Sequence, residues 1–477
     1  MYKILSSLVL GTILGFGQPV LAGTYYVAPI GASISPAPDG SLTAPYPSLA
    51  VALKSGSVVA GDTVMLMDGE HGAVTLYNYP FPASVIIASQ RARNAHLESI
   101  TLTGTTSNLK FRSLSVWPSD YTKVGTDTAL VSAATTTSGI QMNNLDVRTD
   151  KDAANYQSWS AATWDAHKFN GISLSGINSV VRGSTVTGAY HGIIMAGANA
   201  KVFDNLVEGF NGDGMRGTGA KGLFRNNRVI NCVVTDDNHD DGFQSWAPST
   251  GSISGITLDG NTFLEWTGAP NPLSCHLQGI GLFDGFFDSF TIINNVVATT
   301  AYHGISVYGG RKMIIANNTV VNSLGTPSTT PYIAVFNHKN GTSSSDVTVA
   351  NNLAMSIRGT ASTENRVVFV DNTAITSPLT AFQGALAFNY RPATGSSFID
   401  SGDSALAPVG DIEGTPRTSG GAPDRGAYEK GDAIATAVVT DPSVQATSDS
   451  TASGTTETAS TASATTSTMS AKFVPAP

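Results

Sequence analysis

A concentration of ionisable residues between positions 213 and 303 is the part of the sequence best suited to chemistry. Asp213 and Asp241 each precede a glycine in a repeated phrase, and Asp240 stands beside the second of them. Histidines nearby can exchange protons close to neutral pH, and carboxylates can act as acids, bases or metal ligands. The predicted catalytic group consists of Asp213, Arg216, His239, Asp240, Asp241 and His303.

The phrase that contains these aspartates recurs as a polar residue, a glycine and then an apolar residue. Its glycines stand at 171, 192, 214, 242, 279 and 304, at intervals of 21, 22, 28, 37 and 25 residues. A repeat of this length is typical of a solenoid, whose neighbouring strands stack about 4.8 Å apart. The positions before the glycines therefore predict one column of side chains: Asn170, His191, Asp213, Asp241, Gln278 and His303.

Two carboxylates on adjacent turns of this column would repel each other. Either one of them keeps its proton through a raised pKa, or a cation lies between them. Ca²⁺ held by Asp213 and Asp241 is one interpretation, although the sequence lacks the twelve-residue calcium loop. Capping of the turn backbone by aspartate side chains is the other.

Residues after each glycine should alternate between the core and the surface of the solenoid. The first of them is always apolar and is expected to face inward. The fourth gives Trp246, Phe283 and Tyr308 on three successive turns, a row on which sugar rings could stack. The remaining predicted substrate-binding residues are Gln244, His276, Gln278, Asp284, Arg311 and Lys312.

An asparagine column repeats in step with the glycines. Stacked amides can satisfy the backbone of successive turns, so this column is predicted to be structural. Its members are Asn205, Asn227, Asn261, Asn295, Asn318 and Asn352.

Bulk properties narrow the location and the partners. Residues 1–22 have the basic start, apolar centre and small-residue end of a secretory signal peptide, which predicts cleavage after Ala22 and a periplasmic or secreted protein. No later segment is long and apolar enough to predict membrane insertion. The net charge of −9 argues against nucleic acid as a partner. Cys232 and Cys275 are either a disulfide or two buried thiols.

The two ends of the region 23–430 resemble a known family. Thr24-Tyr25-Tyr26-Val27-Ala28-Pro29, followed by a predicted short helix at 48–53, resembles the N-terminal cap of right-handed parallel β-helix proteins. Ala422-Pro423-Asp424-Arg425-Gly426-Ala427-Tyr428-Glu429 resembles the ending of many bacterial members. The resemblance implies an all-β fold, a single-stranded right-handed parallel β-helix of the pectate-lyase-like superfamily. Residues 431–477, rich in Ser, Thr and Ala, are predicted to be a disordered low-complexity tail.

That superfamily implies polysaccharide lyases, C5-epimerases and glycoside hydrolases. For a lyase acting on an acidic glycan, His239 or His303 would be the base, and Arg216 or Ca²⁺ on Asp213 and Asp241 would neutralise the substrate carboxylate. We expect a polysaccharide-cleaving enzyme of this kind.

Two alternatives remain open from the sequence. A glycoside hydrolase would use two of Asp213, Asp241 and Asp284, and the separation of the two carboxyl groups would set the stereochemical outcome. The polygalacturonase branch of the superfamily is matched only in part, by Asp240-Asp241, His303-Gly304 and Arg311-Lys312. A non-catalytic glycan-binding or adhesive solenoid would use the aromatic row alone.

Overall fold

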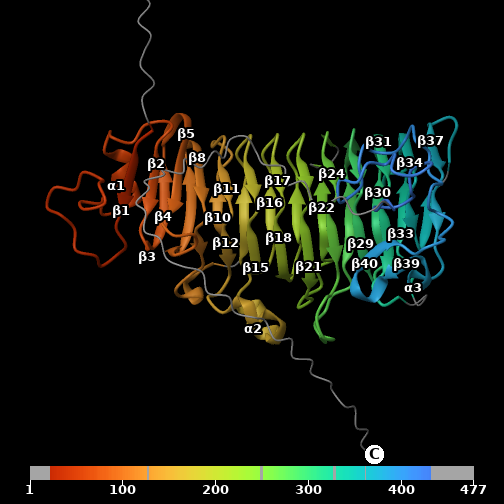
Figure 1. Cartoon of the computed structure of the whole chain (residues 1–477), viewed down its shortest axis with the longest axis horizontal. Coiled ribbons are helices and arrows are strands. Elements are labelled where there is room, and N and C mark those ends of the chain that lie inside the picture. Colours follow the sequence, from red (N-terminus) through yellow and green to blue (C-terminus); the bar gives the residue numbers. More distant parts are fainter. Residues whose placement is uncertain (1–21, 126–127, 248–250, 326–328, 360, 431–477) are drawn as a thin grey trace, which may run out of the picture. The chain divides into compact units, whose positions relative to one another are not determined.

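Three long parallel sheets make up most of the structure, a computed structural model that describes residues 22–125, 128–247, 251–325, 329–359 and 361–430 (Figure 1). Successive turns of the chain add strands to the three sheets in rotation, which confirms the predicted parallel β-solenoid. The predicted signal peptide, apart from Ala22, and the predicted tail at 431–477 lie outside the described residues.

Sheet C carries the repeated glycines. Its strands are, in spatial order, β4 (Ala73–Tyr77), β7 (Ser99–Thr103), β10 (Ala129–Ala133), β13 (Asn170–Leu174), β16 (Ile193–Met195), β19 (Met215–Gly217), β22 (Asp241–Trp246), β26 (Gln278–Asp284), β30 (His303–Tyr308), β33 (Tyr332–Phe336) and β36 (Ser356–Gly359).

Sheet B follows the asparagine column. It contains β3 (Gly69–Glu70), β6 (Ala95–Leu97), β9 (Ser115–Val116), β12 (Asp146–Arg148), β15 (Thr185–Ala189), β18 (Leu206–Phe210), β21 (Arg228–Cys232), β25 (Thr262–Leu264), β29 (Val296–Thr299), β32 (Thr319–Asn322), β35 (Leu353–Ala354) and β38 (Thr373–Ala374).

Sheet A closes the solenoid. It contains β1 (Thr24–Val27), β2 (Thr63–Leu66), β5 (Pro80–Ser89), β8 (Ser107–Arg112), β11 (Gln141–Asn143), β14 (Val180–Arg182), β17 (Lys201–Phe203), β20 (Leu223–Arg225), β24 (Thr257–Asp259), β28 (Thr291–Ile293), β31 (Gly310–Ala316), β34 (Ser345–Ala350) and β37 (Val367–Val370), with β23 (Ser252–Ser254) and β27 (Phe286–Asp288) joined through β31.

The core is an apolar ladder between the sheets. The residues that follow the six glycines are completely buried, as their inward assignment predicted: Ile172, Ile193, Met215, Phe243, Ile280 and Ile305. Contact between successive layers is uninterrupted because each side chain stacks on its counterpart in the next turn.

Each glycine of the repeat lies where two layers approach too closely for a side chain. At Gly214 a Cβ atom would overlap Val229 of sheet B and would lie 3.0 Å from the carbonyl oxygen of Gly242. We therefore expect Gly214→Ala to lower the free energy of unfolding by about 1–3 kcal/mol, the usual effect of overpacking. Urea denaturation measures it, with Gly421→Ala as the control, because the nearest atom to that Cβ is 4.0 Å away. Equal midpoints for the two variants would contradict the prediction.

The asparagine column is structural, as predicted. Asn227 Nδ2 donates to Asn261 Oδ1 at 2.9 Å, and that same oxygen accepts from the Asn227 backbone N–H at 3.0 Å. The pattern repeats from Asn205 to Asn352 and ends on Asn372, which the sequence interpretation had not included. Each amide therefore satisfies the turn of the preceding layer.

Short helices cover the start of the solenoid and interrupt its middle. Helix α1 (Leu49–Lys54) begins where Ser48 Oγ accepts from the Val51 N–H, and it buries Leu49 and Leu53 in the core, which confirms the predicted cap. Residues 148–169, whose sequence lacks the repeated phrase and predicts a long loop, hold η2 (Ala153–Ser158) and α2 (Ala161–Ala166). The other short helices are η1 (Tyr121–Lys123), α3 (Pro378–Ala381) and η3 (Ala385–Ala387).

The end of the strand pattern differs from its prediction. The apolar run Leu386-Ala387-Phe388 predicts a last strand from the sequence, but Leu386 lies in η3 and is largely exposed. A small antiparallel pair, β39 (Phe382–Gly384) and β40 (Asn389–Pro392), flanks η3. The apolar residues of this segment resemble a short strand in sequence, but they form a 3-10 turn instead. No helix of the described chain is long and apolar enough to cross a membrane.

Candidate active site

The predicted column of polar side chains exists at the start of the sheet C strands. The Asp213 N–H donates to Nδ1 of His191 at 2.8 Å, and the Asp241 N–H donates to Oδ1 of Asp213 at 3.0 Å. Asp241 pairs in register with Gln278, and His303 pairs with Tyr332 one strand further on. Asp213 and Asp241 are therefore on adjacent turns, as expected, and the column extends by one member, Tyr332.

Asp213 is buried and ion-paired with Arg216. The side chain of Asp213 is 1% exposed, and the Nε of Arg216 donates to its Oδ2. The guanidinium also lies 5.2 Å from the centre of the Trp246 ring. Burial raises the pKa of Asp213, and the charge of Arg216 opposes that rise. Burial lowers the pKa of His191 to about 2, so its ring is neutral and accepts the Asp213 N–H.

Asp241 is a second buried carboxyl group, with one unused oxygen. Its Oδ2 accepts from Nε2 of Gln244 at 3.1 Å, whereas its Oδ1 has no hydrogen-bond partner among the described residues. That oxygen occupies the space a side chain at Gly281 would need. Burial, then the charges of Asp213 and Asp240, hold the pKa of Asp241 well above its ordinary value. Burial therefore favours the protonated form of Asp241.

The arrangement around these two residues does not fit a calcium ion. Both oxygens of Asp213 already accept from N–H donors, one from Arg216 and one from the backbone of Asp241. Ca²⁺ prefers several oxygen ligands, and an ion between the two carboxyl groups would face the guanidinium. Arg216 supplies the positive charge beside Asp213 that a Ca²⁺ ion would otherwise provide.

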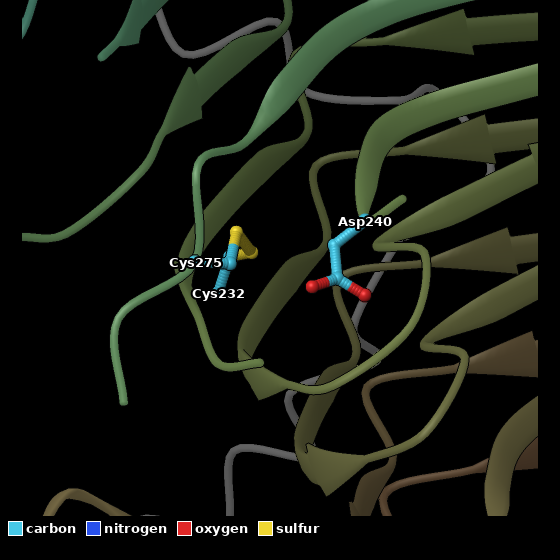
Figure 2. A group of neighbouring side chains, drawn as sticks. All are labelled: Cys232, Asp240 and Cys275. Atoms are coloured by element: carbon cyan, nitrogen blue, oxygen red, sulfur yellow. A yellow bond between two sulfur atoms is a disulfide. The ribbon is translucent and has the colours of Figure 1, made fainter. Parts of the chain in front are cut away.

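Asp240 lies beside a disulfide rather than in a metal site (Figure 2). Cys232 and Cys275, 43 positions apart, are bonded to each other, which resolves the two alternatives left open by the sequence. Their sulfur atoms cannot act as thiolate ligands in this state. Burial raises the pKa of Asp240 to about 8, and its Oδ1 accepts from Asn238 at 3.3 Å. The bond ties the loop before β26 to the end of β21.

His303 is the centre of a separate polar group on the same sheet. Its Nδ1 lies 2.8 Å from Oγ of Ser306 and 2.8 Å from the hydroxyl of Tyr332. Burial lowers the pKa of His303 to about 4, with smaller contributions from His239 and Arg358, so the ring is neutral near pH 7. In the tautomer with the ring proton on Nδ1, which the two hydroxyl oxygens can accept, Nε2 has a free lone pair.

Arg358 completes this group. Its guanidinium lies 4.4 Å from the centre of the Tyr332 ring, and no carboxylate forms an ion pair with it in the described part of the chain. The side chain is exposed. Arg216, by contrast, is already paired with Asp213. Arg358 is therefore the better placed of the two cations to meet an acidic ligand.

The aromatic row forms with a different membership. A register shift after Ser245 pairs Trp246 with Asp284, which takes Trp246 out of line with Phe283. The row instead continues from Phe283 to Tyr308, with ring centres 5.7 Å apart, and from Tyr308 to Phe336 at 5.2 Å. The Phe283 ring also lies 5.1 Å from that of His303. The stacking surface is thus joined to the histidine group and not to Arg216.

Two predicted substrate-binding residues belong elsewhere. Arg311 and Lys312 lie on β31 of sheet A, where Arg311 pairs with Asp288 at 2.6 Å, because the chain leaves sheet C at Gly309. Their position directly after the His303 strand in the sequence suggested that they could reach the face of His303, and the structure places them on another sheet.

The remaining predicted residues lie around the edge of the site. Asp284 is exposed and pairs with Lys339 at 2.6 Å, and His276 contacts Oγ1 of Thr300 at 2.6 Å. Gln278 lies between Asp241 and His303 in the column, and His239 is exposed in the turn before β22.

Sequence reasoning missed four residues of the site: Ser306, Tyr332, Phe336 and Arg358. The turn that carries Tyr332 has no glycine in the repeated position, because the register shifts at Gly304. Counting strands onward from His303 at the local spacing would have found it. Ser306 stands three residues after His303 on the same strand, and it is buried against the histidine ring.

Comparisons with known proteins bear on the fold. A family model described as "Right handed beta helix region" matches residues 170–354. No curated protein matches the chain in sequence. Similar solved structures include pectate lyase Pel9A, with 17% identity and a TM-score of 0.41 over 85% of this chain and 96% of that one.

Two further solved structures are similar at the same distant level. The A-module of the Azotobacter vinelandii mannuronan C-5 epimerase AlgE6 has 15% identity and a TM-score of 0.44, over 68% of this chain and 83% of that one. A rhamnogalacturonan lyase has 14% identity and a TM-score of 0.42, over 76% and 91%. Such distant likeness says nothing of activity. The family-model match and the three parallel sheets make the protein a right-handed parallel β-helix, as its two ends had suggested.

Proposed function

We propose that the protein is a polysaccharide lyase that cleaves an acidic glycan on the outer face of sheet C. One observation carries the proposal: a neutral histidine, His303, is held by two hydroxyl groups beside an arginine without a carboxylate partner in the described chain. β-Elimination from a uronate needs a base near the acidic C5 proton and a cation at the carboxylate. His303 and Arg358 have these properties.

The proposed step balances without a further reactant. Nε2 of His303 removes the C5 proton, and the electron pair forms a double bond between C4 and C5. The bond from C4 to the bridging oxygen breaks, and that oxygen takes a proton from water. Burial raises the pKa of Tyr332 to about 12, so its hydroxyl stays protonated and remains a partner of the histidine ring. Arg358 stabilises the negative charge that grows on the carboxylate.

The alternative hydrolase is less well supported. A general acid must touch the glycosidic oxygen, and the carboxyl groups of Asp213 and Asp241 are both buried inside the protein. Asp284 is exposed, but it is ion-paired with Lys339 and is not paired with a second carboxyl group of the described residues. A secreted or periplasmic location is part of the proposal, supported by the leader-like start of the sequence and by the disulfide between Cys232 and Cys275.

The test uses the purified protein and a panel of acidic and neutral polysaccharides, with and without a calcium chelator. Absorbance of unsaturated uronate and new reducing ends are followed together. Both signals rising on an acidic glycan, unchanged by the chelator, are the expected result. Reducing ends without absorbance would mean hydrolysis, and binding without either signal would favour the glycan-binding alternative. Loss of activity with the chelator would show that a metal, and not Arg358, neutralises the substrate.

The pH dependence of the reaction follows from the lowered pKa of His303. The base must be neutral, so kcat/KM is expected to rise with pH through an acid limb centred near pH 4 and then to level off. An unperturbed histidine would place that limb near pH ~6.5. Initial rates at low substrate concentration between pH 3 and pH 8 measure the profile, and a limb at the ordinary histidine value would contradict the assignment.

A further inference from the structure

A cavity beside the aromatic row is not used by the proposed elimination. It has a volume of about 650 Å³ and opens next to Tyr308 and Phe336, at the ends of β30 and β33. The segments at 343–344 and 362–367 form its other walls. Small-molecule pockets are typically roughly 300–1,000 Å³ in volume, so the space can hold a sugar ring.

The lining of the cavity combines an aromatic surface with uncharged polar groups. The Tyr308 and Phe336 rings are tilted by 50° to each other. Asn337 and Asn365 contribute side-chain amides with no hydrogen-bond partner among the described residues, and Ser343 and Ser362 add hydroxyl groups. None of the described residues that line it is Asp, Glu, Lys, Arg or His. Amides and hydroxyls suit sugar hydroxyl groups, and aromatic rings suit the apolar C–H faces of a sugar.

The cavity and the histidine group lie on the same face but do not coincide. Tyr308 is five residues beyond His303 on β30, so at roughly 3.3 Å per residue their Cα atoms are about 16 Å apart, but their side chains approach each other through the Phe283 ring, which contacts both. Phe336 likewise lies 6.4 Å from Tyr332 between ring centres. The cavity is therefore next to the histidine group, but His303, Ser306, Tyr332 and Arg358 are not among its lining residues, so a sugar in it is a neighbouring unit to the one at His303.

We propose that this cavity is a subsite for an uncharged sugar, so that the substrate carries a neutral residue, in its main chain or as a branch, near the uronate that reacts. An unpaired carboxylate in the cavity would lose its hydration without gaining a cation, which disfavours a uronate there. Arg358 and His303, by contrast, suit a uronate. That the bound sugar is part of a substrate rests on the proposed lyase function. That a neutral sugar binds rests on the cavity alone.

Binding is tested without turnover, by saturation-transfer NMR on the full-length protein. The probes are methyl glycosides of glucose, galactose, mannose and rhamnose and, for comparison, of glucuronic and galacturonic acid. We expect at least one neutral glycoside to bind saturably, and Phe336→Ala to weaken it about 3- to 10-fold. Asn365→Ala, a change at a partly exposed position, should weaken the same glycoside if Phe336→Ala does not fold. Tyr77→Ala is the matched control, since Tyr77 is an exposed aromatic on β4 of the same sheet.

The outcomes separate this inference from the lyase proposal. Uronate glycosides that compete for the cavity as well as neutral ones would overturn the uncharged-sugar assignment, and so would equal binding by the wild type and both cavity variants. If no acidic glycan is cleaved but a neutral glycoside still binds and depends on Phe336, the lyase proposal fails and the subsite stands. A third outcome is that the protein cleaves a pure polyuronate, that Phe336→Ala does not change this cleavage, and that no neutral glycoside binds. That result would overturn the subsite and support the lyase proposal.

Discussion

Replacing His303 with alanine should lower kcat/KM on the acidic glycan by about 10²–10⁴-fold, the usual contribution of a general base. The change removes the nitrogen that takes the C5 proton, while Ser306 and Tyr332 can still bond to each other or to water. Binding of the polysaccharide should change little, because Arg358 and the aromatic row remain. Initial rates from unsaturated-uronate absorbance measure the effect, and tryptophan fluorescence during denaturation shows whether the fold is kept.

His239→Ala is the matched control for this loss. His239 is exposed in the turn before β22, and its charge reaches His303, yet it makes no hydrogen bond to the histidine group in the described chain. We expect a change of less than about threefold in kcat/KM. A large loss of kcat/KM with His239→Ala and a small one with His303→Ala would instead assign the role of base to His239, the other histidine that the sequence pattern named.

The architecture was predictable because it depends on repetition. Every turn of the solenoid has the same structural requirements, such as the close approach of layers at Gly214. These requirements produce the six regularly spaced glycines, the apolar residue after each and the asparagine column. The column with Asp213 and Asp241 on adjacent strands followed from the same regularity. A local period therefore predicts which residues are neighbours.

The predictions that were wrong lie where the chain departs from the regular repeat. The shift after Ser245 took Trp246 out of the aromatic row, and the shift at Gly304 concealed Tyr332 from the repeat. Arg311 follows the His303 strand closely in sequence, but the chain crosses to sheet A before reaching it. Burial was also invisible in the sequence. Asp213 and Asp241 stood out as ionisable groups, and their exclusion from solvent makes them better suited to structure than to catalysis.

Arg216→Ala should lower the free energy of unfolding by about 3 kcal/mol, because it leaves Asp213 buried without its partner. The value is at the lower end of the usual range for a broken buried pair, since Arg216 is itself 21% exposed and Asp213 can take up a proton. Urea denaturation at pH 7 measures the loss. Arg225→Ala, which breaks the more exposed pair with Asp259, should cost at most about 1 kcal/mol.

The double variant Arg216→Ala, Asp213→Asn distinguishes a structural arginine from a substrate-binding one. Removing the buried charge together with its partner should restore much of the lost stability, because the uncompensated carboxylate causes the destabilisation. Elimination activity should recover with the fold, since Arg358 and not Arg216 meets the substrate carboxylate. A double variant that is as stable as the wild type but has lost its affinity for acidic glycan would instead assign Arg216 to the substrate. The buried column would then be part of the binding surface, and the reacting sugar would lie three strands nearer the start of the solenoid than His303 places it.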